Sequence, residues 1–194
     1  MSRPINFEGN TIDIAEALIG KCIRYQSKKG IVSGIINETE AYTQEDPACH
    51  AFNGKKTKRN SPMFLKGGHI YIYFIYGMYH CLNIVTEEEN RGCAVLIRSI
   101  VPLEGKKIIE ENRGTKNTLK SCNGPSKLML GLGIPPTLNT QFIYDSSCPI
   151  SIHNLDIEPT IEQSSRIGIK KGQDLAWRFF DHSLFNKDLS EYRL

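Results

Sequence analysis

Three short segments rich in aromatic and β-branched residues, 69–76, 79–85 and 93–99, follow one another along the chain. Only Gly77 and Met78 separate the first two, and a polar stretch separates the last two. Such segments are typical of strands, and a connection of two residues joins antiparallel neighbours. The pattern therefore predicts an antiparallel meander and argues against a helical bundle.

Because adjacent strands of a meander run in opposite directions, successive turns lie at opposite ends of the sheet. A strand of about six residues is roughly 20 Å long, at about 3.3 Å per residue. The Gly77 turn and residues 97–99 should then lie at one end, and the three glutamates of 87–89 at the other. Carboxylates repel a phosphate backbone. Any polyanionic partner should therefore bind at the Gly77 end, which faces the basic loop 43–62.

Helical patterns flank the meander and indicate a mixed fold. Residues 11–20 place apolar side chains at helical spacing, with Thr11 as a capping residue and Gly20 as a stop. Two further helices are predicted over 103–112 and 125–132.

Additional strands are expected on both sides of the meander. Residues 21–25 and 30–36 form a predicted hairpin, whose second strand runs directly into residues 37–42. A closing hairpin is expected over 166–180, after a turn-rich segment. With 194 residues, 40% of them hydrophobic, and 16 glycines, the chain suits one sheet-rich domain over 1–194.

Charge and cysteine content narrow the chemistry. The net charge of +3 suits a polyanionic partner without establishing one. The six cysteines include no CxxC pair and no close Cys/His quartet, so we expect reduced thiols and no metal. The first ten residues lack the apolar core of a secretory signal, and no stretch approaches the roughly 18 apolar residues of a membrane span. We expect a soluble cytoplasmic protein without membrane contact.

Three features could carry chemistry, and each also has a purely structural interpretation. Glu38 and Glu40 alternate along one strand and share a face, as two acids on an exposed edge would. The aromatic residues of 71–79 have strand spacing, which is more often a sign of core packing. Arg98 follows the apolar run 94–97 and needs a partner if it is buried.

Considered jointly, these features favour a catalytic site. If Glu40 and Arg98 both lie at the Gly77 end of the sheet, they can meet, and the arginine would hold the carboxylate ionised and oriented towards water. Tyr73 and Tyr76 differ in parity, so one can line a pocket while the other projects from the turn.

Several short motifs occur in order between Leu18 and Phe180. They are ETEAY at 38–42, Glu45-Asp46 with His50, Arg59-Asn60 with Met63-Phe64, YIYFIYGMYHCLN at 71–83, AVLIR at 94–98, PLEG at 102–105, GPSKL at 124–128, and RIGI at 166–169 with WRF at 177–179. Each is weak alone. Their order and spacing together resemble the alkyladenine (3-methyladenine) DNA glycosylase family.

The resemblance implies a fold and a set of site residues. The fold would be a single α/β (α+β type) domain with a curved, mainly antiparallel sheet, a protruding β-hairpin and flanking helices. Glu40 would be the general base, and Arg98 would help to position the water. The purine pocket would be formed by Tyr42, His50, Tyr73 and Asn83, with the asparagine crowding the 2-amino group of guanine.

The resemblance also implies contacts with DNA. Tyr76 would be the wedge that fills the gap left by a flipped nucleotide. Met78 at the same turn, Lys58 and Arg59 of the basic loop, and Lys127 complete the DNA-contacting set that we expect.

The implied reaction is monofunctional. Alkylated or deaminated purines, of the 3-methyladenine and hypoxanthine class, would be flipped from double-stranded DNA and released by hydrolysis, leaving an abasic site. We expect a monomer without a cofactor, associated with the nucleoid in a bacterium or located in the nucleus of a eukaryote. Two alternatives stay open: a non-catalytic nucleic-acid-binding module that uses the tyrosines for stacking, and tyrosines that merely form core.

Overall fold

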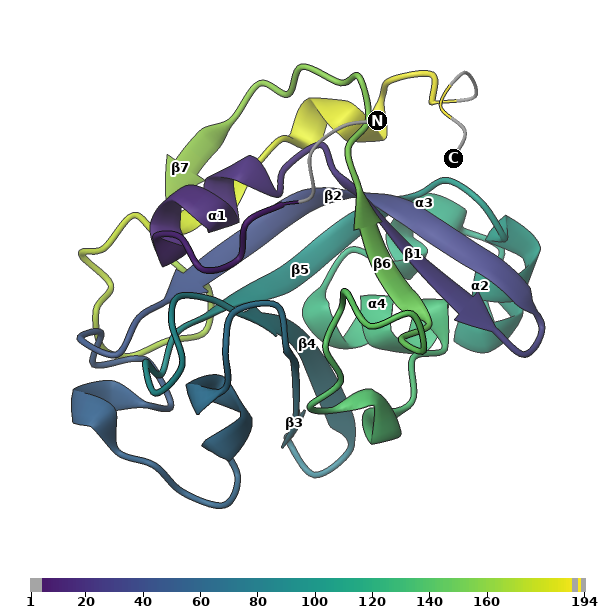
Figure 1. Cartoon of the computed structure of the whole chain (residues 1–194). Coiled ribbons are helices and arrows are strands. Elements are labelled where there is room, and N and C mark those ends of the chain that lie inside the picture. Colours follow the sequence, from purple (N-terminus) through teal and green to yellow (C-terminus); the bar gives the residue numbers. More distant parts are fainter. Residues whose placement is uncertain (1–4, 190–191, 193–194) are drawn as a thin grey trace.

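One antiparallel sheet organises the chain, with strands in the order β3-β4-β5-β2-β1-β6, while β8 pairs with both β2 and β7 (Figure 1). The computed structural model describes residues 5–189 and 192. The strands are β1 (Cys22–Ser27), β2 (Gly30–Tyr42), β3 (Ile70–Ile75), β4 (Tyr79–Val85), β5 (Ala94–Pro102), β6 (Ile150–His153), β7 (Glu162–Ser164) and β8 (Arg178–Phe180).

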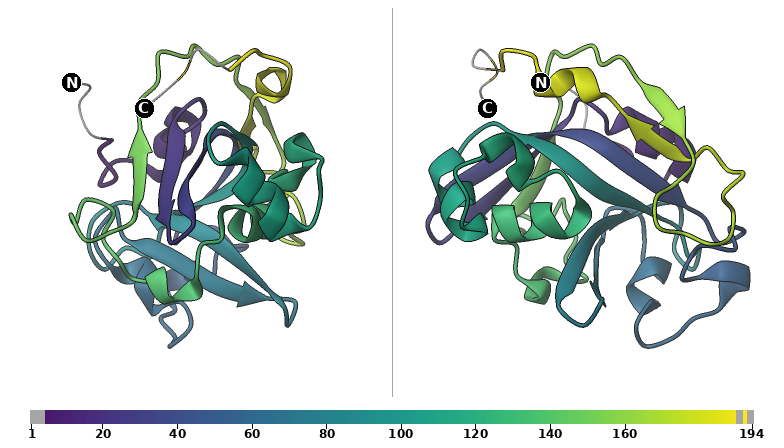
Figure 2. Two further views of the ribbon diagram at one scale, coloured as in Figure 1. Left: turned by 90° about the vertical axis from the view of Figure 1, so that its right-hand side faces the viewer. Right: turned by 180° about the vertical axis from the view of Figure 1, so that it is seen from behind.

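Helices cover both faces of this curved sheet (Figure 2). Helix α1 lies on one face and packs against β2 and β5, whereas α4 packs against β4 and β5 on the other, with α2 and α3 beside it. The helices are α1 (Thr11–Ala17), α2 (Lys106–Arg113), α3 (Thr118–Ser121) and α4 (Pro125–Leu132). The predicted class, an α+β domain with a mainly antiparallel sheet, a hairpin and flanking helices, is confirmed.

The two faces of β2 have different surroundings. Helix α1 packs on one face, and the candidate catalytic side chains lie on the other. Thr39 donates its hydroxyl to the carbonyl of Ala15 at 2.7 Å, which fixes α1 on that face. Glu38 and Glu40 both meet Arg98, and the Tyr42 hydroxyl binds Glu40, so these three side chains lie together on the opposite face. The predicted sharing of one face by the two glutamates is therefore confirmed.

The ladder between β2 and β5 is irregular at the same level. Its register shifts between Ile36 and Glu38 and again between Glu38 and Thr39. As a result Arg98 on β5 has no cross-strand Cα partner in this ladder. Irregularities of this kind re-aim side chains and are common next to active sites. Here the shift brings Arg98 to both glutamates.

The predicted meander is confirmed, and helix ends differ from the sequence expectation. Helix α1 ends at Ala17, and Asn10, not Thr11, is its N-cap, because the Asn10 side chain accepts from two backbone N–H groups of the first turn. The helix expected from residue 103 begins at Lys106, since β5 continues through Pro102. The helix over 125–132 is confirmed.

The prediction of a closing hairpin over 166–180 is wrong. Only Arg178–Phe180 is a strand, and its hairpin partner β7 lies in the segment expected to be turn-rich. Residues 165–177 between them form a long loop, the 165–177 loop, which is held by side-chain bonds rather than by a strand ladder. Strands of three residues, as β7 and β8 are, leave too little alternation to be seen in a sequence.

Apolar side chains from the sheet, α1 and α4 form one continuous core. A second cluster, which includes Met63, Phe64, Tyr71 and Val85, supports the 43–62 loop. Among the described residues, no helix is both long and apolar enough to cross a bilayer. Residues 1–4, part of the segment without a signal-like core, lie outside the described residues.

Candidate active site

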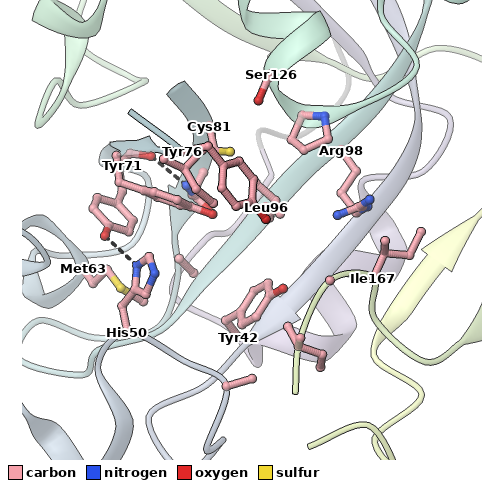
Figure 3. A pocket seen from close by; sticks show the side chains of 18 of the residues that line it. Tyr42, His50, Met63, Tyr71, Tyr76, Cys81, Leu96, Arg98, Ser126 and Ile167 are labelled. Carbon is pink, nitrogen blue, oxygen red and sulfur yellow. Dashed lines mark hydrogen bonds between the residues drawn. The ribbon is translucent and has the colours of Figure 1, made fainter. Parts of the chain in front are cut away.

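A cavity of about 500 Å³ opens between the β3–β4 hairpin, the 43–62 loop, the strands β2 and β5, and the 165–177 loop. Six of the predicted site residues line it: Tyr42, His50, Tyr73, Tyr76, Asn83 and Arg98. Figure 3 shows Arg98 and Ile167 along one side of this cavity and His50, Met63 and Tyr71 along the other, with Tyr42 between them.

Glu40 lies directly behind the cavity wall. Its side chain is 0% exposed and is held by groups that themselves line the cavity. Oε1 accepts the backbone N–H of Ile167 at 2.7 Å and lies 3.3 Å from Nη1 of Arg98. Oε2 accepts the hydroxyl of Tyr42 at 2.7 Å. The carboxylate is therefore buried beside an aromatic cavity and is not part of an exposed strand edge.

Arg98 is shared between two carboxylates. Its Nε donates to Oε1 of Glu38 at 2.8 Å, while its Nη1 faces Glu40. Glu38 accepts a second arginine as well, because Nε of Arg178 lies 2.6 Å from the same Oε1. Glu38 thus fixes the orientation of Arg98 from behind, and the partner that a buried Arg98 was expected to need is present.

The pKa values of the two glutamates are shifted in opposite directions. Burial raises the pKa of Glu40, although the charge of Arg98 and the bonds from Ile167 and Tyr42 act to lower it. Burial also acts to raise the pKa of Glu38, but the bonds and charges of Arg178 and Arg98 outweigh it and lower that pKa. Arg98 meets Glu40, as expected, and its charge favours the ionised carboxylate, but desolvation of the site outweighs this effect on the pKa of Glu40.

The inner end of the cavity is aromatic. Tyr71 and Tyr73 lie with ring centroids 5.5 Å apart, and His50 meets Tyr73 edge-on at 4.7 Å. Nδ1 of His50 lies 2.9 Å from the hydroxyl of Tyr71, and the Asn83 amide donates to the Tyr71 carbonyl at 3.0 Å. Desolvation in the cavity and the nearby charge of Arg59 lower the pKa of His50, although part of its ring faces solvent. These rings offer stacking and edge contacts to a planar ligand.

Tyr76 and Met78 project from the tip of the β3–β4 hairpin. Tyr76 has φ +53°, a left-handed conformation, and its side chain is 78% exposed, while Met78 is 66% exposed. Tyr73, by contrast, faces into the cavity. The sequence expectation that one tyrosine lines a pocket while the other projects from the turn is confirmed, and an exclusively core role for Tyr76 is wrong.

The three cationic residues predicted to contact DNA differ in how far contacts within the protein engage their side chains. Arg59 donates to the carbonyl of Phe74 at 3.0 Å and lies over the Tyr73 ring, so it braces the hairpin. Lys58 is exposed on the same loop. Lys127 on α4 donates to Asn123 at 2.9 Å. None of the three lines the cavity.

A sealed ion pair that we did not predict anchors the site from behind. Arg166 and Asp46 are both 0% exposed and meet through two bonds, from Nη1 to Oδ2 and from Nη2 to Oδ1. Nη1 also donates to the carbonyl of Ala41 at 2.9 Å. The guanidinium lies 4.7 Å from the Tyr42 ring and 5.4 Å from Trp177. We call this arrangement the Arg166 clamp.

The clamp holds the 165–177 loop against the catalytic strand. The residue after Arg166 is Ile167, whose N–H binds Glu40. Gly172 closes the loop at φ +62°, where an added Cβ would come within 2.8 Å of the Asp46 carboxylate. The two motifs that contain Asp46 and Arg166 were visible in the sequence, but 120 residues separate the partners and no local pattern pairs them.

Other lining residues also escaped prediction. They come from seven separate segments: Pro47, Ala48, Met63, Tyr71, Ile75, Cys81, Ala94, Leu96, Pro125, Ser126 and the run 167–171. Leu96 and Cys81 could have been found from the parity of their strands, whereas the 165–177 loop gave no such signal. Across residues 5–189 and 192, no group of three or more His, Cys, Asp or Glu side chains could hold a metal ion.

Comparison with known proteins gives a consistent result. A family model described as methylpurine-DNA glycosylase matches residues 5–183. A relative from Prosthecochloris aestuarii is 41% identical over 174 residues, 89% of this chain and 83% of that protein. One from Francisella tularensis is 39% identical over 88% of this chain and 89% of its own length, and one from Methanoculleus marisnigri is 37% identical over 90% and 91%. Each is provisionally named a 3-methyladenine DNA glycosylase.

Proposed function

The chain belongs to the methylpurine-DNA glycosylase family, and we propose that it releases damaged purines, of the 3-methyladenine and hypoxanthine class, from duplex DNA by hydrolysing the N-glycosidic bond. Membership makes it a DNA repair glycosylase that acts on N-glycosyl bonds. The lesion class, the extrusion of the nucleotide and the water mechanism are our proposal.

One observation supports the mechanism above all others. Glu40 is a fully buried carboxylate at the wall of an aromatic cavity, and its pKa is raised by that burial. A general base works best when its pKa lies close to the working pH. An acid on an exposed strand edge would have neither the raised pKa nor the adjacent cavity.

The proposed step is hydrolysis through an oxocarbenium-like sugar. Each carboxylate oxygen can accept about two hydrogen bonds, and within the described part of the chain Oε2 of Glu40 accepts only the one from Tyr42. Water can therefore bind Oε2 once Tyr42 and Arg98, which cover Glu40 on the cavity side, separate slightly as a nucleotide enters. Glu40 takes the proton of this water, the water oxygen bonds to the anomeric carbon, and the purine leaves with the bonding electron pair. A cationic alkylpurine leaves as a neutral base, whereas hypoxanthine leaves as an anion that takes a proton from solvent.

Glu40 and Arg98 have distinct roles in this step. The negative charge of Glu40 stabilises the positive charge that develops on the sugar. Arg98, fixed by Glu38, orients the carboxylate and the water. Because hydrolysis uses water as the nucleophile, base release leaves an abasic site without strand cleavage.

Extrusion of the nucleotide rests on the hairpin and the cavity. Unstacking a base costs a few kcal/mol, and less at a damaged pair. Stacking on aromatic side chains, which is worth about 1–3 kcal/mol per base, can offset this cost. In this proposal Tyr76, exposed at the hairpin tip, fills the gap, and Tyr42, His50 and Tyr73, which line the cavity, form the slot with Asn83 beside them. Met78 extends the apolar tip.

The remaining parts of the proposal concern the DNA contacts, the oligomeric state and the cellular location. Lys58, Arg59 and Lys127 contact the DNA around the hairpin and α4, with Arg59 acting mainly as a brace. The protein acts as a monomer on double-stranded DNA. It works in the cytoplasm with the nucleoid of a bacterium, or in the nucleus of a eukaryote.

The decisive experiment replaces Glu40 with glutamine. On a duplex with one hypoxanthine, Glu40→Gln should lower the single-turnover rate of base release by about 10²–10⁴-fold, the usual contribution of a general base. Binding to the same duplex should change little. Glu45→Gln is the control, because Glu45 is an exposed glutamate of the neighbouring loop that pairs with Arg91. Release at the wild-type rate by Glu40→Gln would contradict the role of Glu40.

A panel of lesions then tests the substrate class. Wild-type protein should release 3-methyladenine and hypoxanthine and leave undamaged duplex intact, as detected by alkaline cleavage of the abasic product. Tight DNA binding without product from any lesion would instead support a non-catalytic binding module.

A further inference from the structure

Two adjacent lysines stand at the mouth of the cavity on the 165–177 loop. Lys170 and Lys171 line the opening and are exposed. Neither takes part in any of the ion pairs of the described residues. The other cation at the start of the loop, Arg166, is neutralised by Asp46. The loop therefore presents two lysine charges to whatever enters the cavity, and its one acid, Asp174, pairs with neither of them among the ion pairs of the described residues.

The loop is braced, so these charges have a defined position. The Arg166 clamp holds its beginning, and Nη2 of Arg166 also reaches the carbonyl of Gly172. The Gln173 side chain donates to the carbonyl of Ile169 at 2.9 Å, and the Ser165 hydroxyl donates to the carbonyl of Gln173 at 2.7 Å. These bonds close the loop on both sides of the two lysines. Preorganised charges lose less entropy when they bind a ligand.

The opposite rim of the cavity has a different character. It is formed by the hairpin with its exposed Tyr76, and two cations of the 43–62 loop are engaged within the protein. Arg59 is bonded to the Phe74 carbonyl, and Lys56 lies over the Phe64 ring. A strand whose nucleotide enters the cavity has phosphates on both sides of it. On the loop side, Lys170 and Lys171 are the cations at the opening.

We propose that Lys170 and Lys171 form a phosphate-binding site for the backbone of the strand that contains the extruded nucleotide. This inference rests on the proposed function and adds a binding site to it. Because the same loop provides the N–H that binds Glu40, phosphate binding and the orientation of the catalytic carboxylate are joined in one rigid segment. A lysine binds phosphate as a point charge, so the contact depends on the position of the charge and not on a fixed bidentate geometry.

The salt dependence of DNA binding tests this site. Each phosphate contact contributes about 0.9 to the slope of log K against log salt. In a Glu40→Gln background, which should bind without releasing the base, the double variant Lys170→Ala/Lys171→Ala should therefore lower this slope by about 1–2 for a duplex with one hypoxanthine, measured by fluorescence anisotropy over a salt series. Lys170→Arg/Lys171→Arg should restore most of the slope, because it keeps both charges.

The matched control removes the same charge elsewhere. Lys106 and Lys107 are also adjacent and exposed, but they lie on α2, at the other end of the molecule from the 165–177 loop (Figures 1 and 2). Lys106→Ala/Lys107→Ala should change the slope little. Equal slopes for the two alanine variants would overturn the proposed site. Failure of the proposed function would look different, since DNA would bind with its full salt dependence while no lesion is released.

Discussion

Two arginine–carboxylate pairs flank Tyr42, and they differ in how completely they are matched. Arg166 and Asp46 share two bonds, are fully buried, and do not line the cavity. Arg98 approaches Glu40 with one nitrogen at 3.3 Å, is shared with Glu38, and lines the cavity. The first pair leaves no charge available for chemistry.

This difference indicates that the Arg166–Asp46 pair has a structural role, whereas the Arg98–Glu40 pair can take part in a reaction. A buried ion pair with all its partners stabilises one conformation, whereas a buried carboxylate with an incomplete set of partners keeps the capacity to bind water and a proton. Tyr42 joins the two pairs, because its ring lies over Arg166 and its hydroxyl binds Glu40. The sealed pair thus positions the ring and loop that shape the incomplete one.

The largest effect should come from breaking the sealed pair. Arg166→Met leaves Asp46 buried without its partner, so the free energy of unfolding should fall by about 3–5 kcal/mol, measured by urea denaturation. Arg91→Met is the control, because Arg91 is a partly exposed residue that pairs with Glu45 and Glu87, and its loss should cost about 0–1 kcal/mol.

A second variant identifies the cause of this loss. Asp46→Asn/Arg166→Met removes the orphaned charge and should recover part of the stability. Equal destabilisation by Arg166→Met and Arg91→Met would show that the Arg166 clamp contributes no more to the free energy of unfolding than a surface ion pair does.

An intermediate effect should distinguish the two glutamates that share Arg98. The pKa of Glu38 is lowered, so its contribution to stability is present above its ordinary value of 4.5 and is lost as the pH falls through the folded-state pKa. Glu38→Gln should therefore destabilise the protein at neutral pH by about 1.5–3 kcal/mol, the range for bonds to charged groups. The deficit should shrink in acid.

Glu40 should behave in the opposite way. Its pKa is raised, so it favours folding below 4.5 and this contribution is lost as the pH rises through the folded-state pKa. Glu40→Gln should be at least as stable as the wild type at neutral pH. Thermal unfolding of both glutamine variants at about pH 4 and pH 7.5 checks the signs, and destabilisation of the same size by both at neutral pH would contradict the comparison.

The smallest effect concerns the bond that Tyr42 donates to Glu40. Loss of one hydrogen bond to a charged group, worth about 1.5 kcal/mol, corresponds to about one pKa unit. Tyr42→Phe keeps the ring but removes a group that lowers the pKa of Glu40, so the acid limb of the pH profile of base release should move up by about one unit. Tyr73→Phe is the control, since the Glu40 bonds of the described chain do not include Tyr73. An unchanged acid limb in Tyr42→Phe would contradict this coupling.

Local patterns predicted much of the sheet and part of the site. Alternation along 71–85 indicated the hairpin, and parity put Tyr73 and Tyr76 on different sides, so that one could line a pocket while the other projects from the turn. The same parity put Glu38 and Glu40 on one face. These inferences succeeded because strand geometry alone sets which side chains share a face.

The Arg166 clamp and the buried state of Glu40 had no comparable local signal. Asp46 and Arg166 lie 120 residues apart, and the loop between β7 and β8 has no strand or helix period. The lysines at the cavity mouth were missed for the same reason. Their positions depend on side-chain bonds within an irregular loop.

The amino-acid sequence by itself determined the antiparallel meander, the shared face of the two glutamates and the exposed aromatic tip, because each follows from the two-residue period of a strand. Only the tertiary structure decided that Glu40 is sealed from solvent, that Arg98 is divided between two acids, and that Ile167 reaches the carboxylate. Burial and charge pairing depend on every segment that packs around a group, and these segments meet only when the chain has folded.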